Sequence, residues 1–160
     1  MPHRVLLCIA YRLLLVYWFF FRPTGGGAYV AVWSDGQVLI VKNSYKSVWT
    51  FPAGGSKKGE SMPDTAVREL FEEVAIKVAP SELTLVDYFV SHSEYRTDRS
   101  TVFEIDFAER PQFQIDNTEV IDAKFVDFED LTSKRYELAC IANQYVQRKT
   151  QELKELVTDS

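Results

Sequence analysis

The segment from Ser61 to Ile76 has two contrasting faces, and it constrains the fold more than any other part of the chain. Ser61 is a favoured N-cap residue, Pro63 suits a first helical turn, and a helix is predicted to run to about Val74. At 3.6 residues per turn, apolar side chains form one stripe along this helix: Val67, Leu70, Phe71 and Val74. Because such a stripe must be buried, we expect the helix to cover a sheet or another helix.

The opposite face of the same helix is acidic. Glu69, Glu72 and Glu73 lie within one turn of each other, and like charges at these spacings destabilise a helix by roughly 0.2–0.5 kcal/mol per pair. Arg68 compensates part of this repulsion, since it lies four residues before Glu72 and within reach of Glu60. A hard divalent cation, which prefers oxygen ligands, would compensate the rest. A solvated acidic face is the alternative that this helix alone leaves open.

Short apolar and β-branched segments on both sides of this helix predict strands at 28–33, 37–42, 49–51, 83–90, 100–107 and 123–126. Asp35-Gly36 predicts a tight hairpin between the first two strands. A closing helix is predicted from about Ser133, with one apolar face formed by Leu138, Ile141, Ala142 and Tyr145. One helix in mid-chain and one at the end predict an α+β fold, with a sheet covered by helices on both faces.

The N-terminal residues 5–21 read VLLCIAYRLLLVYWFFF, an apolar run that is broken only by Arg12. A transmembrane helix usually needs about 20 such residues, and a central Arg costs roughly 2.5–3.5 kcal/mol on insertion scales. A signal peptide is a second interpretation, but the aromatic residues before Arg22-Pro23 are unlike the approach to a cleavage site. The simplest interpretation is a helix or arm that packs on the domain or on a second subunit. A homodimer and a peripheral membrane contact through residues 5–21 are both open alternatives.

Three regions follow from these patterns. They are an apolar N-terminal helix or arm at 1–24, a globular domain at 25–146 and a polar C-terminal helix end or tail at 147–160. Because the sequence beyond Gln147 is mostly polar, we expect the end of the helix to fray there. The run Gly25-Gly26-Gly27 lacks the Lys-Ser/Thr of a phosphate-binding loop, so it is interpreted as a hinge into the domain.

Composition fits one globular domain, with 160 residues of which 46% are hydrophobic and 26% charged. The 18 Lys and Arg residues against 23 Asp and Glu give a net charge of −5, which argues against a partner of duplex nucleic acid. Cys8 and Cys140 cannot form a zinc ribbon or a disulfide framework. A reducing cytoplasm is therefore the expected location, with association at a membrane surface as the alternative.

The spacing around the acidic helix resembles the Nudix box, Gly-x5-Glu-x7-Arg-Glu-U-x-Glu-Glu-x-Gly-U, in which U is a bulky aliphatic residue. The matching positions are Gly54, Glu60, Arg68, Glu69, Leu70, Glu72, Glu73 and Ile76. Ala75 takes the place of the second glycine, which permits positive φ, so we expect an altered turn there and not an inactive enzyme. The resemblance covers roughly residues 28 to 145 and implies the Nudix fold, a mixed β-sheet sandwiched between helices.

The resemblance also implies an activity. Nudix hydrolases cleave the pyrophosphate bond of a nucleoside diphosphate linked to another group, usually with Mg²⁺ or Mn²⁺. By position in the box, Glu72 and Glu73 would be metal ligands, Glu69 a ligand or general base, and the Gly54 carbonyl a backbone ligand. Glu60 and Arg68 would brace the loop against the helix.

We therefore expect metal-dependent hydrolysis of a small-molecule nucleotide: a nucleotide sugar, a (d)NTP or a dinucleotide. The expected catalytic residues are Arg68, Glu69, Glu72 and Glu73. The alternative is a non-catalytic Nudix domain for nucleotide sensing or protein binding. Retention of all four glutamates of the box argues against that alternative, because a sensor need not keep them.

Weaker candidates lie outside the matched positions. Lys57 stands where the family often has Glu, and with Lys58 it places positive charge near the expected phosphate site. Arg96 and Arg99, in a predicted hairpin loop, are candidates for contact with substrate phosphate or base. Among the acids before the last strand, Glu119 is the candidate for a further base or metal ligand. Arg96, Arg99 and Glu119 each have a plainer interpretation as solvated surface.

Overall fold

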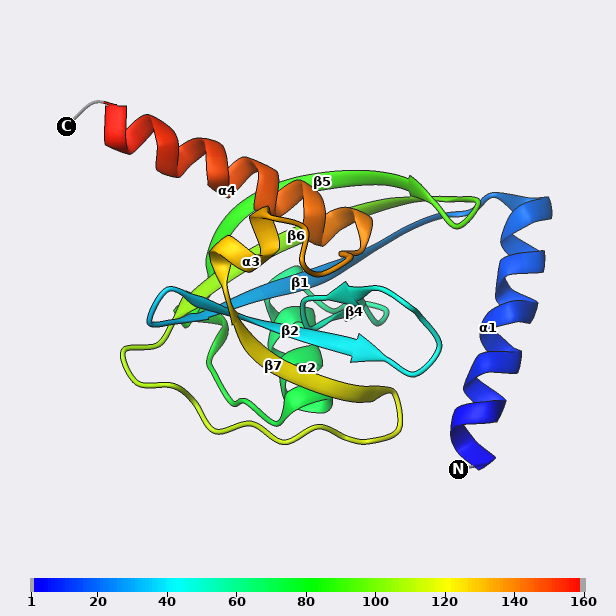
Figure 1. Ribbon diagram of the computed structural model, residues 1–160. Helices are drawn as coiled ribbons and strands as arrows, with labels where there is room; N and C mark the ends of the chain where they lie inside the picture. Colours follow the sequence, from blue (N-terminus) through cyan, green and yellow to red (C-terminus); the bar gives the residue numbers. More distant parts are fainter. Residues whose placement is uncertain (1, 159–160) are drawn as a thin grey trace.

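The computed structural model describes residues 2–158 and has the α+β architecture that the sequence predicts (Figure 1). The helices are α1 (Pro2–Phe21), α2 (Met62–Val74), the short 3-10 helix η1 (Pro80–Glu82), α3 (Phe128–Thr132) and α4 (Cys140–Thr158). The strands are β1 (Thr24–Ser34), β2 (Gln37–Asn43), β3 (Trp49–Thr50), β4 (Ala53–Gly55), β5 (Thr84–Ser93), β6 (Arg96–Asp106) and β7 (Val120–Asp127).

The strands form one mixed sheet in the order β3-β2-β1-β6-β5, with β4 also paired to β1 and β7 to β2. The parallel pairing is that of β1 with β6, from Thr24 beside Thr97 to Trp33 beside Asp106. The other pairs of strands are antiparallel. The N-terminal half of β1 pairs with β4 through Ala28 and Gly54. Strand β4, which contains the first glycine of the box, is thereby attached to the centre of the sheet.

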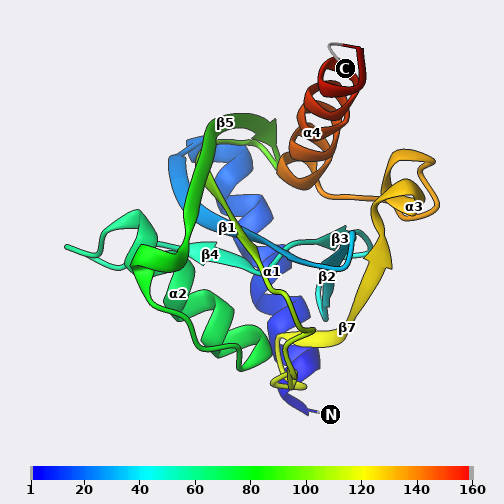
Figure 2. The same cartoon turned by 90° about the vertical axis from the view of Figure 1, so that its left-hand side faces the viewer.

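Each face of the sheet has its own apolar core, and α2 and α4 cover opposite faces (Figure 2). On the α2 side, Ala66, Leu70 and Val74 pack against inward-facing residues of β1 and β2 such as Val30 and Leu39. On the other side, a second cluster joins the alternate residues of these strands to α3 and α4: Ala31, Val38, Ile40, Leu131, Ile141, Ala142 and Tyr145. This alternation follows from the two-residue period of a strand.

The predicted bounds of α2 are confirmed. The Ser61 hydroxyl accepts the Asp64 N–H at 3.3 Å, which satisfies one of the free N–H groups of the first turn. The helix ends at Ala75, whose φ of 58° is left-handed and whose N–H donates to the Phe71 carbonyl. The altered turn expected at this position is therefore wrong, because Ala75 adopts the positive φ that a glycine would permit. Phe71 itself is 45% exposed, so the buried stripe is narrower than predicted.

Two expectations about the chain's irregular segments are wrong. Gly25-Gly26-Gly27 belongs to β1 and is not a hinge. A Cβ on Gly26 would lie 2.5 Å from the Arg99 carbonyl oxygen, and one on Gly27 would overlap the Gly54 carbonyl, so glycine allows the strands to approach closely.

The closing helix begins at Cys140 and not near Ser133. Leu138, predicted on the helix, forms a β-bridge with Trp49, and the Trp49 N–H donates to the Glu137 carbonyl. This non-local pairing holds the segment extended until the helix starts. At the other end α4 continues to Thr158 past the predicted fraying point, supported by pairs such as Arg148–Glu152 at 2.9 Å.

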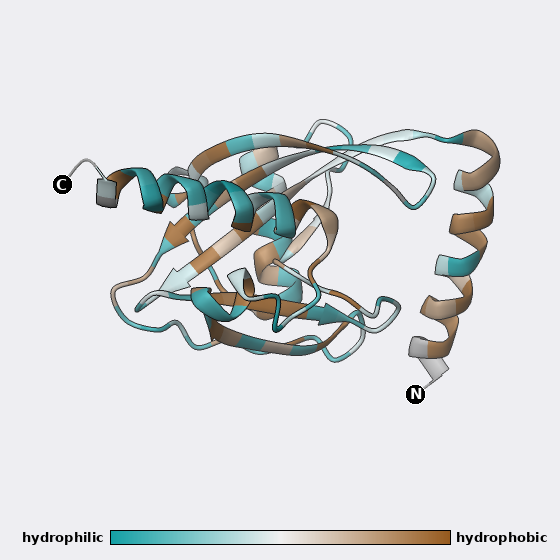
Figure 3. Ribbon diagram, turned by 45° about the horizontal axis from the view of Figure 1, so that its top comes forward, coloured by the Kyte–Doolittle hydropathy of each residue, from teal (hydrophilic) through white to brown (hydrophobic). Residues whose placement is uncertain are grey.

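Helix α1 stands beside the sheet and is apolar around most of its surface (Figures 1 and 3). Its exposed side chains include Val5, Leu6, Ile9, Leu13, Val16, Phe20 and Phe21. None of the helices in residues 2–158, α1 included, combines the length and the hydropathy needed to cross a bilayer.

Candidate active site

The residues of the box occupy β4, the loop after it and α2. Ala53 and Gly54 lie directly against the acidic face of the helix. The Ala53 N–H donates to Glu73 Oε2 at 3.0 Å, and a Cβ on Gly54 would overlap the Glu69 carboxylate. Glycine at position 54 is therefore required by space, because it lets the backbone of β4 approach a catalytic candidate.

Arg68 ties the loop to the helix. Its Nε and Nη2 donate to the two oxygens of Glu60 at 2.7 and 2.9 Å, and Nη2 also donates to the Gly55 carbonyl at 2.9 Å. Its Nη1 donates to Glu69 at 2.6 Å and to Glu72 at 2.9 Å. One guanidinium thus orients three carboxylates of the box, and it uses the planar geometry that suits arginine for bidentate contacts.

The bonds around Glu60 have an electrostatic consequence. Hydrogen bonds from Arg68 and from the Lys57 N–H lower the pKa of the Glu60 carboxyl to about 2. In return, the Glu60 contact raises the pKa of Arg68 above its already high value. Both groups are therefore charged across the range in which the protein would work, and the brace holds.

The three acids of the helix lie in different environments. Glu73 is 5% exposed, and burial raises its pKa well above the usual range, against the opposing bond from the Ala53 N–H. Burial also raises the pKa of Glu69, which Arg68 partly offsets. Glu72 is half-exposed and pairs with Arg68 and, at 3.3 Å, with Lys57. Glu73, the most deeply buried of the three acids, has only neutral hydrogen-bond partners among those described, the Ala53 N–H and the Asn43 side chain.

These acids offer a donor set of oxygens alone, which fits a hard divalent cation. Glu73 is a buried carboxylate whose charge its neutral partners do not cancel, and Gly54 leaves room at Glu69 that a side chain would fill. In residues 2–158 no group of three or more His, Cys, Asp or Glu side chains is already gathered around one metal position. The chemistry of the site fits Mg²⁺ or Mn²⁺, and Arg68 occupies part of the space between Glu69 and Glu72.

Glu119, which precedes β7 and is distant from the box in sequence, lies close to this site in the fold. The Tyr45 hydroxyl donates to Glu119 Oε1 at 2.6 Å, and the negative charge of Glu119 contributes to raising the pKa of Glu73. Asp116 instead accepts the N–H groups of Glu119 and Val120 and so shapes the turn before β7. Among the acids before this strand, Glu119 thus faces the box.

The four basic candidates lie in different places. Lys57 contacts Glu72 as described, and Lys58 is exposed on the same loop. Arg96 begins β6, bonds Asp98 through Nε at 2.8 Å and lies over the Trp18 ring at 4.4 Å. Arg99 is exposed in β6 opposite Val90 and does not line the cavity that contains Arg96. The hairpin loop predicted for these two arginines is wrong, because both belong to strand β6.

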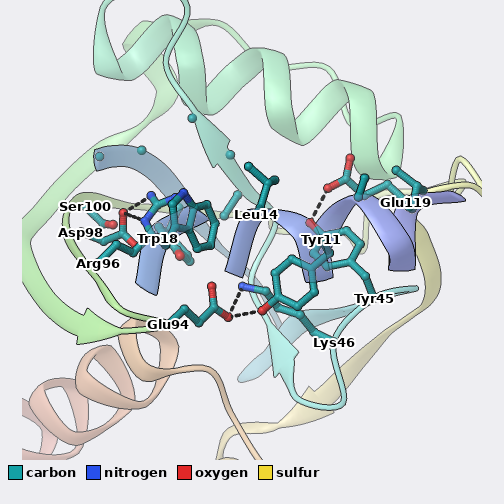
Figure 4. A pocket seen from close by; sticks show the side chains of 18 residues that line it. Tyr11, Leu14, Trp18, Tyr45, Lys46, Glu94, Arg96, Asp98, Ser100 and Glu119 are labelled. Atoms are coloured by element: carbon teal, nitrogen blue, oxygen red, sulfur yellow. Dashed lines mark hydrogen bonds and ion pairs between the residues drawn. The ribbon is translucent and has the colours of Figure 1, made fainter. Parts of the chain in front are cut away.

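A cavity of about 360 Å³ lies over the box and is walled by α1 (Figure 4). Its lining from the sheet and loops comprises Gly26, Gly27, Tyr29, Tyr45, Lys46, Ala53, Gly54, Gly55, Glu94, Arg96, Asp98, Ser100 and Glu119. Its lining from α1 comprises Leu7, Ala10, Tyr11, Leu14 and Trp18. Its volume lies within the range of small-molecule sites.

Sequence reasoning missed most of this lining. Asp98 had a usable signal, because it is two residues after Arg96 and shares its side of an extended strand. Glu94 had none, because it lies in the β5–β6 turn with a positive φ of 55°. Tyr29, Tyr45 and Lys46 had none, since they follow no motif and meet the box only through the packing of β1 and the loop after β2.

Comparison with known proteins identifies the family and the fold. The family model of the NUDIX domain matches residues 23–147. A mouse (Mus musculus) protein named nucleoside diphosphate-linked moiety X motif 6 is 50% identical over 46 residues, which are 28% of this chain and 15% of that protein. An RNA pyrophosphohydrolase from Aeromonas hydrophila is 35% identical over 82 residues, which are 51% of this chain and 45% of that protein. The match spans less than half of either relative.

Solved structures with the same fold cover more of the chain. A MutT protein from Methanosarcina mazei Go1 has a TM-score of 0.73 and 18% identity, covering 84% of this chain and 98% of its own. A bifunctional NMN adenylyltransferase/ADP ribose pyrophosphatase from Francisella tularensis, complexed with AMP and a Mn ion, has a TM-score of 0.68 and 18% identity, covering 91% and 46%. At these identities the two structures establish the fold. Together with the family match over residues 23–147, they confirm the prediction made from the box: this chain belongs to the NUDIX domain family.

Proposed function

We propose that the chain hydrolyses the pyrophosphate bond of a small nucleoside diphosphate derivative. The observation that carries this proposal is the meeting of the cavity floor with the acidic helix. Ala53 and Gly54 line the cavity on one side and contact Glu73 and Glu69 on the other. A diphosphate bound in the cavity would therefore lie next to the carboxylates of the box.

In this proposal Glu72, Glu73 and the Gly54 carbonyl hold Mg²⁺ or Mn²⁺, and Glu69 is either a further ligand or the general base. When bound, the cation would offset the charge of the diphosphate and lower the pKa of the attacking water. The residues of the chain then have distinct tasks. Arg68 orients Glu69 and Glu72, and the Ala53 N–H orients Glu73.

The proton of the attacking water needs an acceptor. Glu69 suits this role because burial raises its pKa toward the range in which a carboxylate accepts a proton effectively. Glu119 is the second candidate, since it lines the cavity and is held by Tyr45. As the water oxygen bonds to phosphorus, the bridging oxygen leaves with the second phosphate group.

The cavity favours a small substrate over a long RNA. It is closed on one side by α1, and the chain carries a net charge of −5, which offers no basic track for a polynucleotide. The Aeromonas relative is named an RNA pyrophosphohydrolase, and the Francisella structure is named an ADP ribose pyrophosphatase. A substrate panel should therefore contain both RNA and ADP-ribose. We propose that the protein acts in the cytoplasm, because Cys8 and Cys140 are free thiols, as is usual in a reducing compartment.

The experiment is phosphate release from a panel containing ADP-ribose, a nucleotide sugar, NTPs, a dinucleotide and a short 5′-triphosphate RNA, each with Mg²⁺ or Mn²⁺. We expect turnover of one class, lost in chelator and reduced on the order of 10³-fold by Glu73→Gln. The Gln side chain keeps the acceptor for the Ala53 N–H, so folding should be retained. Glu109→Gln, at an exposed position away from the box, is the control.

A non-catalytic nucleotide sensor is the second candidate, and one contact favours it. Arg68 neutralises Glu69 and Glu72 at 2.6 and 2.9 Å, and so competes with a cation for the same oxygens. If folded wild-type protein binds a nucleotide from the panel but hydrolyses nothing with either metal, the sensor replaces the hydrolase.

A further inference from the structure

Helix α1 presents one stripe of its surface to the cavity. Leu7, Ala10, Tyr11, Leu14 and Trp18 all line it, and their spacing places them on one side of a helix. The same helix exposes apolar residues such as Leu13, Val16 and Phe20 on its other sides. Apolar character alone therefore does not explain which side faces the domain.

Directional contacts anchor the middle of α1. The Tyr11 hydroxyl donates to Glu94 Oε1 at 2.5 Å, and Lys46 Nζ lies 2.9 Å from the same oxygen. The Tyr11 ring packs on Tyr45 with centroids 5.0 Å apart, and Lys46 lies over it at 5.6 Å. Tyr11 thus joins α1 to the β5–β6 turn and to the loop after β2.

Near its C-terminal end, α1 is anchored by Trp18. The Arg96 guanidinium lies 4.4 Å from the Trp18 ring centroid, and Asp98 holds Arg96 from the other side. Figure 4 shows Trp18, Arg96, Asp98 and Ser100 at one end of the cavity, with Tyr45 and Glu119 at the other. The cavity therefore has an aromatic end and an end beside the acids.

This division matches the two parts of a nucleotide. The end near Gly54 and Glu119 adjoins the carboxylates proposed to act on the diphosphate. The other end offers the aromatic ring of Trp18, which the Arg96 guanidinium covers on one face, together with the polar side chains of Asp98 and Ser100. A nucleobase needs such a combination, because its faces stack on aromatic rings and its edge forms hydrogen bonds.

Resting on the proposed function, we propose that α1 is part of the substrate site, and that the nucleobase binds at the Trp18 end of the cavity by stacking on that ring. The helix thereby selects a nucleoside over other groups attached to a diphosphate. Residues 5–21 accordingly serve recognition as a wall of the site, and they need no membrane or second subunit to do so.

The first test is binding without turnover, with the full chain in chelator. AMP is the probe, and ribose 5-phosphate is the matched compound that lacks a base. We expect AMP to quench tryptophan emission in the wild type and to lose that effect in Trp18→Phe, which leaves Trp33 and Trp49 as the remaining fluorophores. Ribose 5-phosphate should leave the emission unchanged.

The second test is kinetic, on whichever panel compound the wild type hydrolyses. Trp18→Ala should raise KM about 10-fold with kcat within about threefold, and Trp18→Phe should restore most of the loss. Ala10→Trp, which fills the cavity without removing a contact of Trp18, should also raise KM. Leu13→Trp, on the exposed side of the same helix, is the control and should leave KM unchanged.

The outcomes separate this inference from the proposed function. If the wild type shows metal-dependent turnover that Glu73→Gln abolishes, but Trp18→Ala and Ala10→Trp leave KM unchanged, the base does not bind at α1 and the inference is wrong. If nothing is hydrolysed but AMP still quenches Trp18, the nucleoside site stands and the hydrolase fails. If Leu13→Trp raises KM as much as Ala10→Trp, the effect belongs to helix integrity, and the inference is overturned.

Discussion

Helices α1 and α2 both border the same cavity, yet they are held in opposite ways. In α2, Ala66, Leu70 and Val74 are buried in the core, so its acidic face is positioned by the packing of the whole domain. In α1 most large apolar side chains are exposed, and the helix is held through Tyr11, Trp18 and their polar partners. Close packing resists small displacements, whereas a few surface contacts resist them weakly.

The difference assigns different tasks to the two walls. Chemistry at a diphosphate requires carboxylates held to within a fraction of an ångström, which the buried side of α2 provides. Recognition of a base by stacking tolerates more movement, which the anchoring of α1 allows. The comparison predicts that variants in α2 change stability or catalysis strongly, and that matched variants in α1 change them little.

The largest expected effect is a difference in the free energy of unfolding between leucine-to-alanine variants in the middle of α2 and of α1. Leu70→Ala should lower the free energy of unfolding by about 3 kcal/mol, because it leaves a cavity in the core. Leu13→Ala, at a residue 65% exposed, should change it by less than about 0.5 kcal/mol. Urea denaturation of both variants measures this. An equal loss in Leu13→Ala would mean that α1 is buried against another surface in solution.

The next effect concerns the contact of β4 with α2. Gly54→Ala should reduce kcat/KM about 100-fold, because its Cβ would overlap the Glu69 carboxylate and displace it. Gly55→Ala is a close control, since its Cβ would meet the Gly26 carbonyl oxygen at an ordinary 3.9 Å. Steady-state kinetics on the preferred substrate compares the two. Equal activities would show that Glu69 is free to move aside.

A smaller effect is expected from the brace at Glu60. Since the folded pKa of about 2 is below that of an unfolded glutamate, Glu60 stabilises the fold above the usual carboxyl range, and this stabilisation is lost as pH falls toward 2. Glu60→Gln should therefore lower the melting temperature at pH 7 and converge with the wild type in acid. Melting curves from pH 2.5 to 7 test it, with Glu109→Gln as control. A gap that is independent of pH would contradict this assignment.

The smallest effect compares the ends of the two helices, which both carry a non-glycine residue at positive φ: Ala75 at 58° and Arg22 at 43°. Ala75→Gly should raise the free energy of unfolding by about 1 kcal/mol by relieving left-handed strain. Arg22→Gly relieves similar strain but should not shift the global transition, because α1 lies outside the core. A similar gain in both variants would show that α1 unfolds together with the domain.

Local patterns predicted α2 and its box well, because everything that defines them lies within one stretch of chain. Ser61 caps the helix, Leu70 and Val74 are buried, and Arg68 meets Glu60, all at spacings legible in sequence. The family follows from the same spacings. The roles of Glu69, Glu72 and Glu73 in metal binding stay predictions.

The features that could not be predicted from the sequence depend on contacts between segments that are distant along the chain. Leu138 has the spacing of the α4 stripe, but its pairing with Trp49 decides its conformation. The glycines before Ala28 look like a hinge until β4 and β6 are placed beside them. Likewise, no periodicity connects Tyr11 to Glu94 or Trp18 to Arg96, so the wall formed by α1 emerged only in three dimensions.

The parallel pairing of β1 with β6 also sets the order in which the domain can fold during synthesis. Thr24 cannot pair until Thr97 has been synthesised, and Trp33 cannot pair until Asp106 has been synthesised. These partners are about 70 residues apart, which at about 5–20 residues per second is a delay on the order of 4–14 s. Throughout that interval the edge of β1 that pairs with β6 stays unpaired, although β2, β4 and α2, which also contact β1, are synthesised before β6. The nascent chain is thus most exposed to aggregation before β6 emerges, and chaperones that bind apolar segments would act in that interval.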